Sequence, residues 1–280
     1  MISRRTFLKT SGLAAAGAAL GTGIYAWRVE PHWLQIVTRT MRVQGLPREW
    51  ISRRLAHLTD LHLGPLVADD YLLETFRRVS ALRPDLVAYT GDFVSHETGL
   101  VAHADRIFAK LPRGRFGTLG VLGNHDYGHW WAHPEAASNL VGVLESHGVQ
   151  MLRNEQTNVG GLQVVGLDDI WAGRFDAARG FAAIDPKQGT IALVHNPDAV
   201  DRPGWNAHRG WILAGHTHGG QCKPPFLPPP ILPVQNKLYT AGEFRLSGDR
   251  RLYINRGVGH LLQARFNVRP EVTIFDLQPA

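Results

Sequence analysis

The stretch Phe116-Gly117-Thr118-Leu119-Gly120-Val121-Leu122-Gly123-Asn124-His125-Asp126 decides the fold, because an apolar run typical of a buried strand ends directly in polar residues. In layered α/β architectures, sites are built where strands run out into loops. Asn124 offers an amide oxygen to a hard cation, His125 offers an imidazole beside it, and Asp126 can hold that imidazole in one tautomer. Taken alone, the tetrapeptide also fits a plain polar turn that closes a strand.

Four other predicted strand ends carry matching groups. The apolar runs 54–59, 86–90, 190–194 and 210–214 are followed by these residues: Asp60 and His62, Asp92, His195, and His216 with His218. With Asn124 they make seven oxygen and nitrogen donors without sulfur, a set that suits Mn²⁺, iron or Zn²⁺. Seven donors are too many for one tetrahedral ion and about right for two ions that share a carboxylate.

The spacing within two of these motifs supports shared sites. Residues two apart in an extended strand exit point the same way, so we expect Asp60 and His62 to bind one ion together. The segment 216–218 has the same spacing. It lies between Gly215 and the pair Gly219-Gly220, and glycine allows the backbone to turn sharply beside a metal.

The rest of the chain predicts one domain of two packed sheets flanked by helices. Helices are expected at 69–82, 100–111 and 135–147, and further strands at 33–39, 162–167, 238–240, 251–254 and 272–275. Six prolines between residues 222 and 233 predict a stiff loop. At 280 residues, 44% hydrophobic and 19% charged, the chain can bury a substantial core.

The N-terminus resembles a twin-arginine export signal. Ser3-Arg4-Arg5-Thr6-Phe7-Leu8-Lys9 precedes an uncharged stretch at 10–27 that is rich in alanine and glycine, the layout of a secretory signal. We therefore expect residues 1–27 to be a signal or membrane anchor, 28–49 a linker with an edge strand, and 50–280 the functional domain. No A-x-A site lies just before Trp27, so cleavage and retention as an anchor both stay open. The export machinery is an expected partner.

Charge and cysteine content narrow the function classes. The net charge is +6, and the chain beyond residue 27 holds 27 basic and 24 acidic residues, a mild excess that suits anionic substrates or lipid surfaces. No basic cluster with interleaved aromatics is present, so nucleic acid is not an expected partner. Cys222 is the only cysteine, which excludes an internal disulfide and a thiolate-rich metal site.

The motifs together resemble the calcineurin-like metallophosphoesterase superfamily. They are D-x-H at Asp60, G-D at Asp92, G-N-H-D at Asn124, a lone histidine at His195 and G-H-x-H at His216, in this order over roughly residues 52–220. The tail segments 255–259 and 265–270 are similar to those of the bacterial phosphodiesterases that are exported by the twin-arginine route. The resemblance implies a four-layer αββα sandwich of two mixed β-sheets flanked by helices. The dinuclear metal site would lie at the C-terminal strand edges.

The resemblance also implies a division of the ligands. One ion would take Asp60, His62, Asp92 and His218. The other would take Asp92, Asn124, His195 and His216, with Asp92 as the bridge. Many family members carry an acid where Ser95 stands, and that acid is generally not a direct ligand, so we expect activity with altered outer hydrogen bonding.

This arrangement predicts a metal-dependent phosphodiesterase. Two divalent ions about 3.5–4 Å apart can deprotonate a bridging water and clamp an in-line displacement at phosphorus. His125 would protonate the leaving oxygen or stabilise the pentavalent state, with Asp126 orienting it. One alternative is a pyrophosphatase acting on a nucleotide-sugar lipid such as UDP-diacylglucosamine. Another is a non-catalytic metal-binding envelope protein on this fold. A non-enzymatic scaffold would lack ligands or the catalytic histidine, and here all are present.

The substrate and location are expected at the cell envelope. The domain should be periplasmic or lie on the outer face of the cytoplasmic membrane, with contact to its surface. Apolar residues of the proline-rich loop, close in sequence to His216, suit a lipid-linked phosphoester: Phe226, Leu227, Ile231 and Leu232. Packing of these side chains on the second sheet is the alternative. No substrate-binding residue is otherwise identified.

Several further residues are open to two interpretations. His57, in the middle of a predicted strand, is expected to be structural. Trp130 and Trp131 fit either a wall for the substrate or ordinary packing. Asp168 and Asp169 fit a loop carboxylate pair better than a third metal site. His260 and Arg256 either face the site or support the fold.

Overall fold

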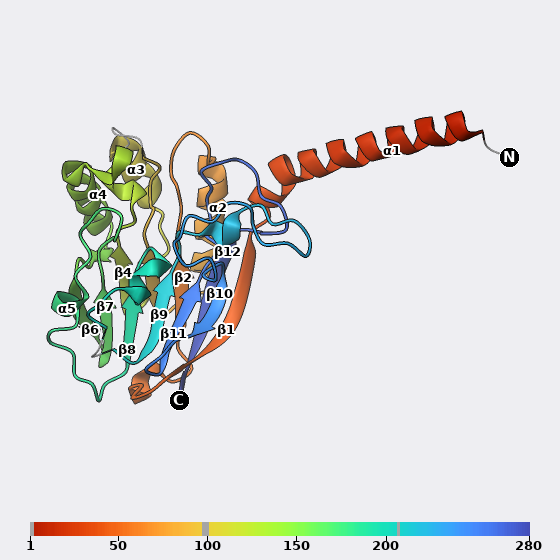
Figure 1. Cartoon of the computed structure of the whole chain (residues 1–280). Coiled ribbons are helices and arrows are strands. Elements are labelled where there is room, and N and C mark those ends of the chain that lie inside the picture. Colours follow the sequence, from red (N-terminus) through yellow and green to blue (C-terminus); the bar gives the residue numbers. More distant parts are fainter. Residues whose placement is uncertain (1–2, 97–100, 206–207) are drawn as a thin grey trace.

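Two six-stranded β-sheets form the centre of the computed structural model, which describes residues 3–96, 101–205 and 208–280 (Figure 1). The first sheet has the order β1 (Gln35–Val43), β12 (Glu271–Pro279), β2 (Arg54–Leu58), β3 (Leu86–Thr90), β4 (Gly117–Val121) and β5 (Gln150–Met151). The second has the order β10 (Gly242–Arg245), β11 (Arg250–Ile254), β9 (Gly210–Ala214), β8 (Thr190–Leu193), β7 (Leu162–Gly166) and β6 (Glu155–Val159).

Both sheets are mixed, as predicted. In the first sheet β2, β3, β4 and β5 run parallel, and β12 is antiparallel to β2. In the second, β7, β8, β9 and β11 run parallel, while the outer strands β6 and β10 are antiparallel to their neighbours. The parallel strands therefore direct their C-terminal ends to one edge of each sheet, where loops can build a site.

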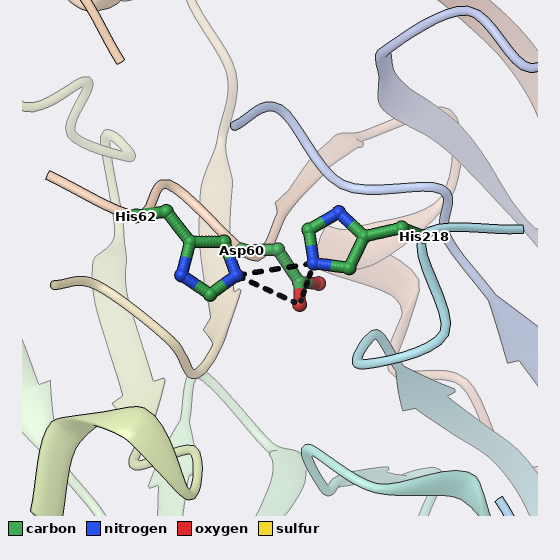
Figure 2. A group of neighbouring side chains, drawn as sticks. All are labelled: Asp60, His62 and His218. Carbon is green, nitrogen blue, oxygen red and sulfur yellow. Dashed lines mark hydrogen bonds and ion pairs between the residues drawn. The ribbon is translucent and has the colours of Figure 1, made fainter. Parts of the chain in front are cut away.

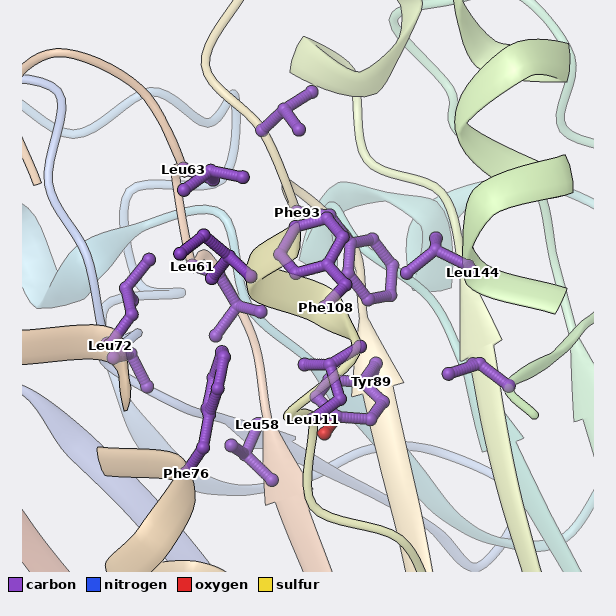
Figure 3. Close-up of a cluster of buried hydrophobic side chains, with 14 of the residues drawn as sticks. Leu58, Leu61, Leu63, Leu72, Phe76, Tyr89, Phe93, Phe108, Leu111 and Leu144 are labelled. Carbon is purple, nitrogen blue, oxygen red and sulfur yellow. The ribbon is translucent and has the colours of Figure 1, made fainter. Parts of the chain in front are cut away.

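Strand β2 shows how the layers arise from alternating side chains. Leu55 contributes to a core between the two sheets, whereas Ala56 and Leu58 contribute to a core between the first sheet and the helices. The covering helices are α2 (Asp69–Ala81), α3 (Val101–Phe108) and α4 (Pro134–Ser146). Figure 3 shows part of this helix-facing core, which includes Phe76 from α2.

The layer that covers the outer face of the second sheet is thinner than the helical layer that covers the first sheet. A third core there joins strands β7, β8, β9 and β11 to α5 (Ala177–Gly180) and to the 3₁₀ segment η6 (Pro197–Asp201). The predicted αββα order of layers is thus confirmed, with one four-residue helix and connecting segments in the fourth layer. Shorter 3₁₀ segments lie at loops, among them η3 (Arg48–Trp50), η4 (His125–Tyr127), η5 (His129–Trp131) and η7 (His218–Gly220).

Sequence patterns located most of these elements, with two kinds of error. Residues 238–240 form a turn and not the predicted strand. The backbone amide of Tyr239 donates to the carbonyl oxygen of Asn236 there, and strand β10 begins only at Gly242. The short or polar strands β5 and β6 carry no apolar run and were not predicted. The helix predicted at 100–111 is α3, and its expected first residue lies outside the described residues.

The N-terminal helix α1 (Arg4–Ile24) projects away from the rest of the molecule, and none of its residues is buried (Figure 1). Among the described residues, no helix combines the length and the apolar character needed to cross a membrane. The segments η1 (Tyr25–Val29) and η2 (Glu30–His32) follow it, and Glu30 is buried. The stretch expected to be a linker therefore begins inside the folded domain.

Buried neutral histidines predict a loss of stability in acid. His57 is fully buried against Thr90, and burial lowers its pKa to about 3, whereas the unfolded chain has an ordinary value near 6.5. The unfolded state therefore binds more protons below pH 6.5, and we expect His57 to cost about 2 kcal/mol of unfolding free energy by pH 5. In denaturant titrations at pH 5 and 7, His57→Gln should reduce this difference. An unchanged pH dependence in that variant would contradict the assignment.

Candidate metal centre

All seven predicted ligands follow the C-terminal ends of parallel strands. Asp60 and His62 follow β2, Asp92 follows β3, Asn124 follows β4, His195 follows β8, and His216 and His218 follow β9. All seven side chains are buried. The two sheets thus bring groups that are far apart in the sequence to one place between their edges.

The backbone at these positions is unusual. Five of the seven residues have positive φ: Asp60 at 53°, His62 at 49°, Asp92 at 52°, His216 at 72° and His218 at 49°. The left-handed region costs a residue with a side chain roughly 1–2 kcal/mol, and such strain clusters at functional sites. The expectation that Asp60 and His62 converge through an extended strand exit was therefore wrong in its backbone geometry. They converge because both adopt the left-handed conformation.

The first group of donors consists of Asp60 and His62, from the segment after β2, and His218, from the segment after β9. Their side chains point toward one another in Figure 2. The Nε2 atoms of His62 and His218 lie 3.0 Å apart. Asp60 Oδ1 lies 3.2 Å from His218 Nε2 and 3.8 Å from His62 Nε2. Three donor atoms therefore face a common point.

The second group consists of Asp92, His195 and His216, with Asn124 beside them. His195 Nε2 lies 3.1 Å from Asp92 Oδ2, from His216 Nδ1 and from Asn124 Oδ1. The Asn124 Nδ2 atom is buried without a hydrogen-bond partner. The amide oxygen is thus the atom that Asn124 presents to the group.

Asp92 lies between the two groups. Its Oδ2 atom is 3.1 Å from His195 Nε2 of the second group and 3.6 Å from His62 Nε2 of the first. Its Oδ1 atom accepts a hydrogen bond from the backbone amide of His125 at 2.9 Å. One carboxylate oxygen therefore faces both groups while the other holds the following loop.

Backbone carbonyls orient two of the histidines. Thr90 O lies 2.8 Å from His195 Nδ1, so that nitrogen donates and Nε2 is the atom that faces Asp92. Pro233 O lies 2.8 Å from His216 Nε2, which leaves Nδ1 to face His195. Such outer hydrogen bonds fix the tautomer and ring orientation of metal-binding histidines.

The electrostatics favour ionised Asp60 and Asp92, neutral His62 and His216, and a protonated His195. Burial would lower the pKa of His195, but the Asp92 carboxylate raises it to about 10. Burial alone would raise the pKa of Asp60, but His218 outweighs it and holds this pKa below its ordinary value. Burial likewise opposes the effect of His195 on Asp92, and the pKa of Asp92 still lies well below its usual range. Burial lowers the pKa of His62 far below 6.5 and that of His216 to about 3.

These residues fit two divalent cations. Two buried carboxylates and four buried histidines converge in two groups, and a cation between the nitrogen atoms of each group would satisfy donors that otherwise face one another. The oxygen and nitrogen donor set suits divalent metals of the first transition row.

His125 lies beside the first group but is not oriented by Asp126. The rings of His125 and His62 are 5.3 Å apart, and His125 Nδ1 has no hydrogen-bond partner. The two oxygens of Asp126 instead accept from the backbone amides of Val94 and Gly123. The expected Asp126–His125 contact was therefore wrong, because these amides take up the buried carboxylate.

A cleft of about 310 Å³ opens onto both groups. Asp92, His125, His216 and His218 lie at its inner end. Its walls are mainly apolar and include these side chains: Trp171, Cys222, Pro230, Ile231, Pro233, Leu261 and Leu262. The volume falls in the range of small-molecule sites.

Trp171 was not foreseen from the sequence. Its ring packs edge-on against His216 with centroids 4.4 Å apart, and Trp131 packs on it at 4.6 Å. The Asp169 carboxylate accepts from the Trp171 and Ala172 amides and so holds this turn. No local motif indicates the contact, since Trp171 and His216 meet only through the fold.

The other residues for which the sequence left two interpretations make contacts that support the fold. Asp168 accepts from Tyr127 and Arg153, so the pair Asp168-Asp169 supports loops. His260 contacts Leu66 O, and Arg256 pairs with Glu271. Of the two tryptophans, Trp131 packs on Trp171 while Trp130 is 76% exposed.

Ser95 takes an outer position. It is buried, and its hydroxyl donates to the carbonyl oxygen of His62 at 3.2 Å. This bond holds the backbone of a candidate ligand where many family members carry an acid. Activity with serine at this position stays a prediction.

The fold and this centre are those of a metal-dependent phosphoesterase, and comparison with known proteins gives the family. A calcineurin-like phosphoesterase model matches residues 53–220, and a twin-arginine translocation pathway signal model matches residues 1–21. The chain belongs to the calcineurin-like phosphoesterase family and carries a twin-arginine signal sequence.

Three relatives span nearly the whole chain. The phosphodiesterase YaeI of Escherichia coli is 32% identical over 99% of this chain and 100% of its own length. The metallophosphoesterase YkuE of Bacillus subtilis is 30% identical over 99% and 98%. The UDP-2,3-diacylglucosamine pyrophosphatase LpxG of Chlamydia muridarum is 27% identical over 93% and 94%.

These relationships establish the predicted activity class. The protein is a hydrolase that acts on phosphoesters with divalent metals, and its signal directs it to twin-arginine export toward the periplasmic side. The two donor groups account for two divalent cations.

Proposed function

We propose that one cation is held by Asp60, His62 and His218 and the other by Asn124, His195 and His216, with Asp92 shared between them. The observation that carries this assignment is the position of Asp92 Oδ2, which faces histidines of both groups. Manganese, iron and zinc all suit the donors. Metal analysis of the purified protein tests the expected two ions per chain and identifies the element.

In the proposed reaction the two cations supply an activated water and neutralise charge on the phosphoryl group. His125 lines the cleft beside the first group and donates a proton or hydrogen bond to the leaving oxygen. Burial lowers the pKa of His125, so the negative charge of a bound phosphoester is needed to keep it protonated at neutral pH. The Asp126 carboxylate holds the loop by accepting two backbone amides.

The proposed substrate is a phosphodiester or pyrophosphate on a lipid or another envelope component. The apolar walls of the cleft favour a substrate that brings an apolar group to the metals. The exported state favours an envelope compound. Pyrophosphate hydrolysis in a nucleotide-sugar lipid is a second candidate, which the relative LpxG supports, and product analysis by mass spectrometry separates it from diester cleavage.

A surface beside the cleft supports contact with the outer face of the cytoplasmic membrane. The proline-rich loop exposes Phe226, Leu227 and Ile231, and Leu262, which lines the cleft with Ile231, is exposed as well. Leu232, expected to be exposed as well, is buried. Exposed apolar side chains at one mouth are typical of surfaces that meet lipid. Lys223 in the same loop is exposed and favours anionic headgroups.

Two double variants test the lipid proposal. Ile231→Ser with Leu262→Ser removes apolar contact inside the cleft and should lower kcat/KM for lipid-linked substrates about 10–100-fold, in micelles as well as in vesicles. Phe226→Ser with Leu227→Ser removes the exposed tip and should lower turnover only in vesicles. Both variants should hydrolyse bis(p-nitrophenyl) phosphate at the rate of the unaltered protein.

Leu238→Ser is a matched control, because Leu238 is 75% exposed and does not line the cleft. It should leave every substrate unaffected. A parallel loss on lipid-linked and soluble substrates in the cleft variant would mean that these side chains support the fold, and the lipid proposal would lose its main support.

A further inference from the structure

Arg265 is a fully buried cation whose hydrogen bonds go to backbone carbonyls. Its Nη2 atom donates to Gly259 O at 2.6 Å, Arg256 O at 3.0 Å and Gly257 O at 3.3 Å, and its Nη1 atom donates to Val268 O at 3.2 Å. Burial lowers the pKa of Arg265 to about 10. A buried charge is costly unless acceptors surround it, and the carbonyls serve the two Nη atoms while Nε is buried without a partner.

The carbonyls that Arg265 gathers belong to a segment pressed against the first donor group. The Gly259 amide bonds Asp60 O, and a Cβ atom on Gly259 would lie 2.2 Å from Leu61 O. A Cβ atom on Gly257, where φ is +72°, would lie 2.7 Å from Asp60 Cβ. The Arg265 Nη2 atom itself lies 3.2 Å from His218 Nδ1. Arg265 thus contacts one candidate ligand and supports the segment behind another.

The loop that carries Arg265 is in turn held by the residues just after the export helix. The Glu30 carboxylate is buried and accepts from the amides of Asn267 at 2.9 Å and Val268 at 2.5 Å. The Arg265 amide donates to Ala26 O at 2.8 Å. A carboxylate that accepts two buried amides is expensive to remove, because both amides lose their partner.

We propose that Glu30 and Arg265 are positioning residues for the cation held by Asp60, His62 and His218. The docked segment 26–32 holds the Arg265 loop, and Arg265 holds the backbone behind Asp60. The inference rests on the ligand assignment proposed above. It gives the tail segments 255–259 and 265–270 a role, and it requires that any removal of the export helix leave Ala26 and Glu30 in place.

The test is a metal titration of the full chain that uses no substrate. Protein freed of metal with a chelator is titrated with Mn²⁺ by calorimetry. Glu30→Gln keeps the shape of the side chain but turns an amide NH₂ toward one of the two backbone donors. We expect one of the two ions to bind about 10–100-fold more weakly, the usual effect of disturbing the residues that support a ligand. Arg265→Lys, which keeps the charge but loses the planar fork, should weaken the same ion.

A double-variant comparison assigns the affected ion. In a His195→Ala background, where the second group is broken, Glu30→Gln should still weaken the remaining ion. In a His62→Ala background, where the first group is broken, Glu30→Gln should have no further effect. This pattern follows only if Glu30 is coupled to the first group.

Glu243→Gln is the matched control, because Glu243 lies on the edge strand β10 and pairs with Arg251 of β11. The Glu243→Gln variant should bind both ions normally. Glu30→Gln protein that melts at a lower temperature yet binds both ions with unaltered affinity would overturn the inference and leave Glu30 a purely structural residue. Equal weakening of both ions would overturn it as well. Unaltered protein that binds no Mn²⁺ would overturn both this inference and the ligand assignment beneath it.

Discussion

Replacing Asp92 with asparagine is expected to abolish binding of two ions and to reduce phosphodiesterase activity by about 10³-fold or more. The reason is that Asp92 Oδ2 faces both donor groups, so the substitution removes a negative charge from between two dications. Several kcal/mol of transition-state stabilisation depend on the ions, and each 1.36 kcal/mol is a factor of ten in rate. Plasma emission spectrometry should find well below two metal ions per chain.

Asp105→Asn is a suitable control for this variant. Asp105 is an exposed carboxylate that pairs with His147, and its loss should change neither metal content nor turnover. If Asp92→Asn protein retained two tightly held ions, Asp92 would not be the shared ligand and the assignment of both groups would have to be revised.

The substitution His125→Ala is expected to separate catalysis from metal binding. His125 lines the cleft but belongs to neither donor group, so metal content should stay at the level of the unaltered protein. Turnover should fall by about 10²–10⁴-fold, the usual contribution of a general acid. The loss should be smaller for p-nitrophenyl esters than for alkyl esters, because nitrophenolate leaves without protonation. Steady-state kinetics on the two ester types measure this difference.

The outcome that speaks against the acid role is an equal loss on both ester types. That result would favour the other expected role, in which His125 stabilises the pentavalent state of every substrate alike. His133→Ala controls for the removal of an imidazole near this loop, since His133 is partly exposed and pairs with Glu135. It should leave the kinetics unaltered.

The chemistry of the site could be predicted from the sequence because it depends on which residues directly follow each strand. Apolar runs that end in aspartate, asparagine or histidine mark strands whose ends carry ligands, and β2, β3, β4, β8 and β9 all follow this pattern. Parallel strands bring such ends to one edge whatever the details of packing. The seven candidate donors therefore followed from residue types and their order, and the class of reaction followed from the resemblance of these motifs to a known family.

The left-handed backbone conformation of the candidate ligands could not be predicted from the sequence pattern. The Asp60 amide bonds Gly91 O and the His62 amide bonds Asp92 O, so the exits of β2 and β3 hold each other in the left-handed region. Asp126 likewise turned away from His125 because the Val94 amide lies on the neighbouring strand exit. Such conformations depend on partners about 30 residues away, which local spacing does not reveal.

Only the folded chain shows which candidate ligands lie together and which residues support them. His62 and His218 are separated by 156 residues and meet through the packing of two sheets. Glu30 reaches amides of the tail across 237 residues, which no motif near the export signal indicates. Contacts of this range are selected by the total packing of the chain, since the entropy of closing such loops is repaid only when the whole core forms. The sequence therefore specifies the candidate donors, while the tertiary structure decides which of them lie together and which contacts hold them.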